Sequence, residues 1–298
     1  MPPSHSPRLT PLALCGLVAA GALGACASPD DTSTRLTVAV SFFPVEELVR
    51  NVVGDAGDAI EIVPIVPAGA DAHEYEPTPK QLDDLADTDV VVLLGGQLQP
   101  GVERAVAELD RATRVDLLDS VDLVDGDPHV WLSPRLMADM ARAVADAIAP
   151  LVDDPAPIRA NAAAYADALA DLDAEFRASL AGCADAVLVT AHYAFGYLAR
   201  DYGLRAAPIA GISPSEEPSA ATLAELAELA SAEGVTTIFF EEALPDDLAA
   251  TLAAEVGATT AVLDPVESPP ADRIDEGATY LSLMRANLSA LQTGLGCG

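Results

Sequence analysis

Short apolar segments alternate with amphipathic segments along the first half of the chain. Three apolar runs have the length and the valine and isoleucine content of buried strands. They are LTVAVSFF (36–43), AIEIVPIV (59–66) and DVVVLLGG (89–96). Helical patterns at 44–53 and 78–86 separate these runs. Strands that alternate with helices predict βαβ units and a parallel sheet.

The second half of the chain shows the same alternation without repeating the sequence. Its strand-like runs are AVLVT (186–190), TTIFFEE (236–242) and TTAVLD (259–264). Its helical patterns cover 193–201, where Gly203 is the expected C-cap, and 220–232, 245–256 and 276–291. We therefore expect a second parallel sheet flanked by helices.

A long helical pattern lies between the two halves. It follows a shorter helix, which we expect to begin with Ser133 as N-cap and Pro134 at the first helical position. The long segment, 156–180, spans roughly 35–40 Å at 1.5 Å per residue. The prediction is an α/β fold of two lobes with parallel sheets flanked by helices, joined by one long rigid helix. We place the N-terminal α/β lobe at 35–150, the linking helix at 151–182 and the C-terminal α/β lobe at 183–298.

The N-terminal residues have a different character. A single basic side chain, Arg8, precedes an apolar run that is too short and too interrupted for a membrane-spanning helix, so residues 1–25 are predicted to be a signal peptide. The run ends in Leu-Gly-Ala-Cys, as in bacterial lipoprotein signals, in which Cys26 would carry the lipid. A plain secretory signal with an incidental cysteine is the alternative. Polar residues 26–34 predict a flexible tether.

Two cysteines, Cys183 and Cys297, remain beyond the signal and the lipidation site. Outside the cytoplasm an isolated pair favours a disulfide, which would tie the C-terminus to the start of the second half. Two free buried thiols are the alternative.

The net charge of −32 arises from 47 acidic and 15 basic residues. Such a surface repels nucleic acid, so DNA and RNA are excluded as partners. The acidic segment 117–127 is expected to be a solvated loop rather than a device that gathers cations.

Three histidines remain once His5 is removed with the signal, and each lies near the end of a predicted strand or in a loop before a helix. They are His73, His129 and His192. Asp264 also ends a predicted strand. Because ligands of open α/β sheets bind beyond the carboxyl ends of the strands, we expect these four side chains to face one site, two from each half.

Three imidazoles and a carboxylate are typical of a site for a first-row transition metal, with zinc as the first choice. Four protein ligands leave no position for an activated water, which favours binding over catalysis. The sequence also lacks the H-E-x-x-H pattern of zinc hydrolases, so we expect no enzyme activity.

The motifs around these residues resemble those of the metal-binding lipoproteins of bacterial zinc and manganese ABC importers, the ZnuA/TroA-like family. They are GADAHEYEPTP (69–79), DPHVWLSP (127–134), VTAHYAFGYLARDYGL (189–204), IAGISPSEEPS (209–219), FFEE (239–242) and VLDP (262–265). The resemblance extends from Leu36 nearly to the C-terminus. It implies two α/β lobes joined by a long helix, with the metal in the cleft between them.

The resemblance implies His73 and His129 as ligands from the first lobe, and His192 and Asp264 as ligands from the second. Some zinc-binding members have Glu just before the first histidine, where this chain has Ala72, so Asp264 is the expected fourth ligand. Members that carry manganese usually have Glu at the third position. His192 at this place favours Zn²⁺ over Mn²⁺.

Glu74, Glu76, Glu241 and Glu242 lie close to the ligands in the sequence. Any of them could accept a hydrogen bond from the second nitrogen of a ligating histidine. For each one singly, a surface or capping role is the expectation. Trp131 is expected to pack beneath His129.

We therefore expect an extracytoplasmic zinc-binding protein that hands Zn²⁺ to an ABC permease. It would be anchored to the cell membrane by a lipid at Cys26 and would act as a monomer. A manganese or iron carrier on the same scaffold is one alternative. A surface adhesin that retains a structural metal is another.

Overall fold

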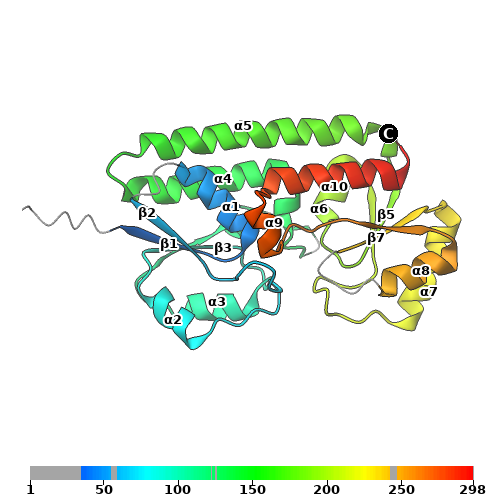
Figure 1. Cartoon of the computed structure of the whole chain (residues 1–298), viewed down its shortest axis with the longest axis horizontal. Coiled ribbons are helices and arrows are strands. Elements are labelled where there is room, and N and C mark those ends of the chain that lie inside the picture. The colour runs from blue at the N-terminus through cyan, green and yellow to red at the C-terminus, as the bar shows by residue number, and fades with distance from the viewer. Residues whose placement is uncertain (1–34, 55–58, 122, 125, 242–246, 298) are drawn as a thin grey trace, which may run out of the picture. The chain divides into compact units, whose positions relative to one another are not determined.

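Parallel strands form two four-stranded sheets, one in each half of the chain (Figure 1). The computed structural model describes residues 35–54, 59–121, 123–124, 126–241 and 247–297. The first sheet has the order β2-β1-β3-β4 and the second has the order β6-β5-β7-β8. Their strands are β1 (Leu36–Val40), β2 (Ile60–Pro64), β3 (Val90–Leu93), β4 (Thr113–Asp116), β5 (Val187–Thr190), β6 (Arg205–Pro208), β7 (Thr237–Phe240) and β8 (Thr259–Val262). Both sheets thus confirm the predicted two-lobe α/β class.

Helices connect the strands and cover the sheets. The α-helices are α1 (Phe43–Val53), α2 (Pro79–Ala86), α3 (Pro100–Ala107), α4 (Pro134–Ile148), α5 (Ala156–Ser179), α6 (Gly196–Tyr202), α7 (Ala220–Glu233), α8 (Asp247–Val256), α9 (Ala271–Asp275) and α10 (Tyr280–Leu295). Short 3-10 turns are η2 (Leu117–Ser120), η3 (Val130–Leu132), η4 (Ala149–Leu151) and η5 (Ala181–Cys183). α4 begins as predicted, because Ser133 Oγ accepts a hydrogen bond from Leu136 N. Gly203 ends α6 in the left-handed conformation, with φ 73°.

The long helix α5 joins the two lobes and runs alongside both sheets (Figure 1). Its 24 residues correspond to about 36 Å of helix. Near its start, Asn161 donates from Nδ2 to the carbonyl oxygens of Val52 and Val53 at the end of α1. Near its end, the Phe176 ring stacks on Tyr202 of α6 at 4.9 Å between centroids. Because one helix is fastened to both lobes, large movements between the lobes are restrained.

Four elements depart from the sequence prediction: β4, β6, α3 and α9 have no counterpart in it. β4 and β6 are edge strands with the sequences TRVD and RAAP, and most of their residues are exposed or half-buried. An edge strand is stabilised by hydrogen bonds to one neighbour and needs no apolar run of its own, so the hydrophobic pattern missed both.

The predicted signal peptide, the lipidation site at Cys26 and the tether all lie outside the described residues. Within the described part of the chain, every helix is too short or too polar to cross a membrane.

Cys183 and Cys297 are joined by a disulfide across 114 positions of sequence, with their Cα atoms 5.4 Å apart. Cys183 lies in η5, directly before the second sheet, and Cys297 follows α10. The bond therefore ties the last helix to the entrance of the C-terminal lobe, as the cysteine count predicted.

Replacing both cysteines by serine should lower the free energy of unfolding by about 2–4 kcal/mol, because the unfolded chain regains the entropy that the cross-link removes. Urea denaturation followed by circular dichroism would measure this difference. Wild-type protein treated with a reductant is the control and should match the variant. Equal midpoints for oxidised and reduced wild type would contradict a stabilising role.

Candidate metal centre

His73 lies in the loop that follows β2. Its main-chain N–H donates to Asp71 Oδ1 at 2.8 Å, and the N–H of Glu74 donates to the same oxygen at 3.3 Å. On the other side of the loop, the buried Gln99 donates from Nε2 to the carbonyl oxygen of Ala72 at 3.2 Å. An Asp that accepts an N–H two residues further on forms a compact turn. The main chain on both sides of His73 is thus fixed.

His129 lies in the loop before α4, and Asp127 contacts both its main chain and its ring. Asp127 Oδ1 accepts from the main-chain N–H of His129 at 2.9 Å and lies 2.7 Å from its ring Nδ1. The Trp131 ring packs against the imidazole, with centroids 5.1 Å apart, and both side chains are fully buried. Because Nδ1 is occupied by Asp127, the ring presents Nε2 on its opposite side.

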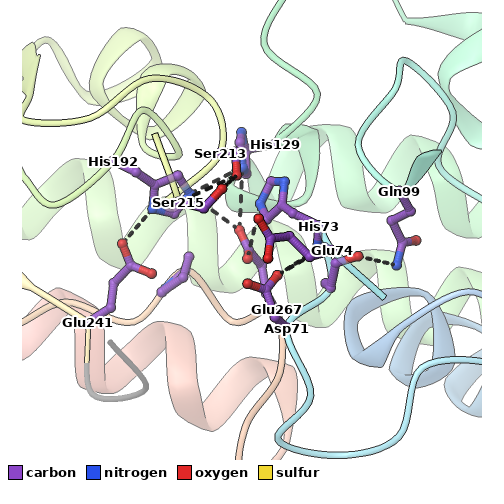
Figure 2. Close-up of polar contacts among 12 residues, drawn as sticks. Asp71, His73, Glu74, Gln99, His129, His192, Ser213, Ser215, Glu241 and Glu267 are labelled. Carbon is purple, nitrogen blue, oxygen red and sulfur yellow. Dashed lines mark hydrogen bonds and ion pairs between the residues drawn. The ribbon is translucent and has the colours of Figure 1, made fainter. Parts of the chain in front are cut away.

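His192 follows β5 by two residues. Thr190 Oγ1, at the end of that strand, donates to the carbonyl oxygen of His192 at 2.9 Å. The ring Nδ1 lies 2.5 Å from Glu241 Oε1, and Glu241 directly follows β7 (Figure 2). A carboxylate at the end of one strand therefore orients an imidazole at the end of its neighbour.

Glu267 brings these three imidazoles together (Figure 2). Its carboxylate lies 3.4 Å from His73 Nε2, 3.4 Å from His129 Nε2 and 3.6 Å from His192 Nε2. The Nε2 atoms of His129 and His192 are themselves 3.4 Å apart. All four side chains are buried, and the four candidate ligand atoms lie within 4.8 Å of one another.

These separations suit a small tetrahedral ion. An ion bound to nitrogen at 2.0–2.1 Å in tetrahedral geometry has its ligand atoms about 3.3 Å apart. The four separations given above, 3.4–3.6 Å, are close to this value, and all the candidate ligand atoms lie within 4.8 Å of one another. One carboxylate and three imidazoles, each offering Nε2, form a donor set that zinc favours.

Burial and charge shift the pKa values of the cluster in opposite directions. Burial acts to raise the pKa of Glu267, but the close contacts with the three histidines outweigh it and hold that pKa well below the usual range. Burial acts to lower the pKa of His192, yet its contacts with Glu241 and Glu267 raise it to about 10. The pKa of His129 is raised in the same way by Asp127 and Glu267. An incoming cation therefore meets an ionised carboxylate and displaces protons from His129 and His192.

A cavity of about 200 Å³ adjoins the carboxylate side of the cluster. Its lining includes Glu241, Glu267, Asp71 and Asp264, together with the prolines of segment 265–270. None of the three histidines is among its described lining residues. The carboxylates thus face the cavity, and the imidazoles lie behind them.

The structure brings together His73, His129 and His192, as the sequence predicted, but it places Glu267 rather than Asp264 in their cluster. Asp264 Oδ1 accepts from Val266 N at 2.7 Å, and Asp264 Oδ2 lies 3.6 Å from Arg273 Nη1. Asp71 and Asp127 each form a turn with an N–H two residues on, and Asp264 does the same, so all three act as turn formers next to the cluster.

The glutamates that the sequence offered as hydrogen-bond partners of the histidines have different contacts in the structure. Glu241 bonds the ring of His192, whereas Glu76 pairs with Arg104 at 2.6 Å and Glu74 is exposed. Glu242 lies outside the described residues. Asp127, which belongs to the acidic segment 117–127, is not solvated as expected there but buried against His129.

Comparison with known proteins gives a family match over most of the chain. Residues 38–294 match the family described as "ZnuA: Zinc-uptake complex component A periplasmic". The high-affinity zinc uptake system protein ZnuA of Bacillus subtilis is 33% identical over 291 residues, which cover 90% of both chains. The zinc-binding lipoprotein AdcA of Streptococcus pneumoniae is also 33% identical, over 94% of this chain but only 59% of its own length. The chain thus spans less than two thirds of AdcA's length.

Two solved structures have a fold similar to that of this chain. The Zn(II)-bound ZnuA-like domain of Streptococcus pneumoniae AdcA is 35% identical and superposes with a TM-score of 0.76 over 88% of this chain and 99% of the domain. The laminin-binding protein Lmb of Streptococcus agalactiae, described as having adhesin and metal-transporting activity, is 29% identical. It superposes with a TM-score of 0.78 over 87% of this chain and 99% of its own.

Replacing Asp127 by Asn should weaken zinc binding about 10- to 100-fold, because a neutral amide no longer holds the imidazole of His129 with a charge. The amide oxygen can still accept the main-chain N–H, so the loop should keep its shape. Competition with a chromophoric chelator would measure the affinity. Asp139→Asn, on exposed α4 surface beside Arg142, is the matched control. Equal affinities for the two variants would contradict the role of Asp127.

Proposed function

The chain belongs to the zinc-uptake complex component A family, and we propose that it captures Zn²⁺ outside the cytoplasmic membrane and delivers it to an ABC-type permease. One observation carries this proposal, namely the convergence of three buried imidazoles and the Glu267 carboxylate at tetrahedral spacing. The ligands of the bound ion are His73, His129, His192 and Glu267. Glu267 replaces Asp264 of the sequence-based set because its carboxylate lies within reach of all three Nε2 atoms.

Zinc fits this donor set better than manganese. Three neutral nitrogen donors and one carboxylate match the borderline character of Zn²⁺, whereas Mn²⁺ prefers a larger number of oxygen ligands in octahedral geometry. The relatives named for zinc uptake and zinc binding support the same choice. A manganese carrier on this scaffold would be expected to offer more oxygen ligands than this cluster does.

Four protein ligands suit cargo binding rather than catalysis. A catalytic zinc site keeps a coordination position open for water, and here the fourth position belongs to Glu267. The family is a component of an uptake complex, not a class of enzymes. The buried cluster holds its ion, and delivery requires the ligands of one lobe to move away from those of the other.

We place the protein at the outer side of the cell membrane, held as a monomer by a lipid on Cys26. The lipoprotein relative AdcA supports this anchor. The Lmb relative, described as an adhesin and a metal transporter, makes the adhesin alternative compatible with the fold. The buried cluster, however, supports metal binding and gives no support to an adhesin role.

Replacing His129 by Ala should abolish high-affinity zinc binding, because it removes one of the four proposed ligands. Calorimetric titration of demetallated protein with Zn²⁺ would measure the effect. Circular dichroism of the same samples should show an unchanged fold. Unchanged zinc affinity in the folded variant would refute the proposed function.

The fourth ligand can be identified with two isosteric variants. Glu267→Gln should weaken zinc binding about 100-fold or more, since even hydrogen-bond partners of metal ligands contribute 10- to 100-fold. Asp264→Asn keeps an oxygen that can accept the N–H of Val266, so its effect should be much smaller. Chelator competition would rank the two variants. The reverse order would assign the ligand to Asp264, as the sequence alone suggested.

A further inference from the structure

Side chains from other elements hold the four-residue turn that carries Glu267, which we call the Glu267 turn (264–267). Asn287 of α10 clamps its first residue: Oδ1 accepts from Asp264 N at 2.9 Å, and Nδ2 donates to the Asp264 carbonyl oxygen at 2.6 Å. Trp131, 134 positions away in the sequence, donates from its indole Nε1 to the carbonyl oxygen of Pro265 at 2.8 Å. The turn is therefore fixed at two consecutive carbonyl groups.

The main chain within this turn has an unfavourable conformation. Val266 has a φ of 61°, in the left-handed region that β-branched residues rarely adopt. Such a conformation persists only where the surrounding contacts enforce it. The hydrogen bonds of Asp264, Trp131 and Asn287 supply this enforcement, and the next residue in the chain is Glu267.

Trp131 is itself held rigidly in the first lobe. Its carbonyl oxygen accepts a hydrogen bond from Tyr280 Oη at 2.5 Å, and its indole packs against the Phe42 ring edge to face, with centroids 5.0 Å apart. Tyr280, the first residue of α10, is held in turn by a bond from its N–H to Glu47 Oε2 at 3.0 Å. Trp131 lies two residues after His129, so this side chain connects the loop of one candidate ligand directly to the turn of another.

We propose that Trp131 is a positioning residue for zinc, and that its indole N–H fixes the place of Glu267 relative to His129 before the ion arrives. This inference rests on the proposed function. An apolar side chain would fill the same space, but it would leave the Pro265 carbonyl without this donor. The preformed spacing then favours a small tetrahedral ion over a larger one, because the carboxylate cannot move outward freely.

The test is Trp131→Phe, which keeps an aromatic ring and removes the N–H. Zinc affinity measured by chelator competition should fall about 10-fold or more, the range seen for other groups that orient metal ligands. In protein loaded with Co²⁺, the intense visible absorption of a four-coordinate site should weaken as Glu267 moves out of place. A purely structural role would lower thermal stability without changing this spectrum.

Phe42→Leu is the matched control, because it disturbs the packing of the same indole and leaves its N–H bond to Pro265 in place. It should lower the melting temperature while zinc affinity and the Co²⁺ spectrum stay as in wild type. If Trp131→Phe does not fold, Tyr280→Phe removes the bond that holds the Trp131 carbonyl and should shift affinity and spectrum in the same direction.

The outcomes separate this inference from the proposed function. If wild type binds zinc, His129→Ala does not, and the tryptophan or tyrosine variant binds with wild-type affinity and spectrum, the positioning role is overturned and the function stands. If wild-type protein itself fails to bind zinc, the proposed function falls and the inference falls with it.

Discussion

The buried negative charge of Glu267 is the constraint on which the site depends. A carboxylate removed from water costs several kcal/mol unless charged or hydrogen-bonding groups compensate it. Three imidazoles surround it, and two of them rest on further buried carboxylates, Asp127 and Glu241. Three buried acids thus face three imidazoles. Contacts with these acids raise the pKa values of His129 and His192, so protons on these two imidazoles offset part of the charge, and a bound divalent cation would take their place.

The two-lobe fold places the histidine and glutamate side chains of the site at the ends of strands. Both sheets have the same strand order, and His192, Glu241 and Glu267 all follow carboxyl ends of strands in the second sheet. In open parallel sheets this edge is where the loops converge and ligands bind. The first lobe provides His73 and His129 on loops that Asp side chains fold into turns.

Rigidity between the lobes has an identifiable origin. α5 is fastened to α1 by Asn161 and to α6 by Phe176, and the hydrophobic core extends across both lobes. Polar bonds from Trp131 and Tyr280 add a second connection close to the site. The cluster therefore lies between two bodies that are restrained from moving far apart. Release of the ion must then use small displacements of ligand-bearing loops.

The apolar runs and caps of the sequence by themselves determined the α/β class and the long helix, because hydrophobic period and capping act between residues close in the chain. The three histidines as candidate ligands came from their small number, their places near predicted strand ends and the motifs around them. The same patterns missed the edge strands β4 and β6, whose stability comes from a neighbour. They also pointed to Asp264 at the end of a predicted strand and did not single out Glu267, because a local pattern does not show which carboxylate beyond a strand reaches the histidines. Only the tertiary structure decided that choice. The bonds that aim Glu267 come from Trp131 and Asn287, far away in the sequence and adjacent only once the chain has folded.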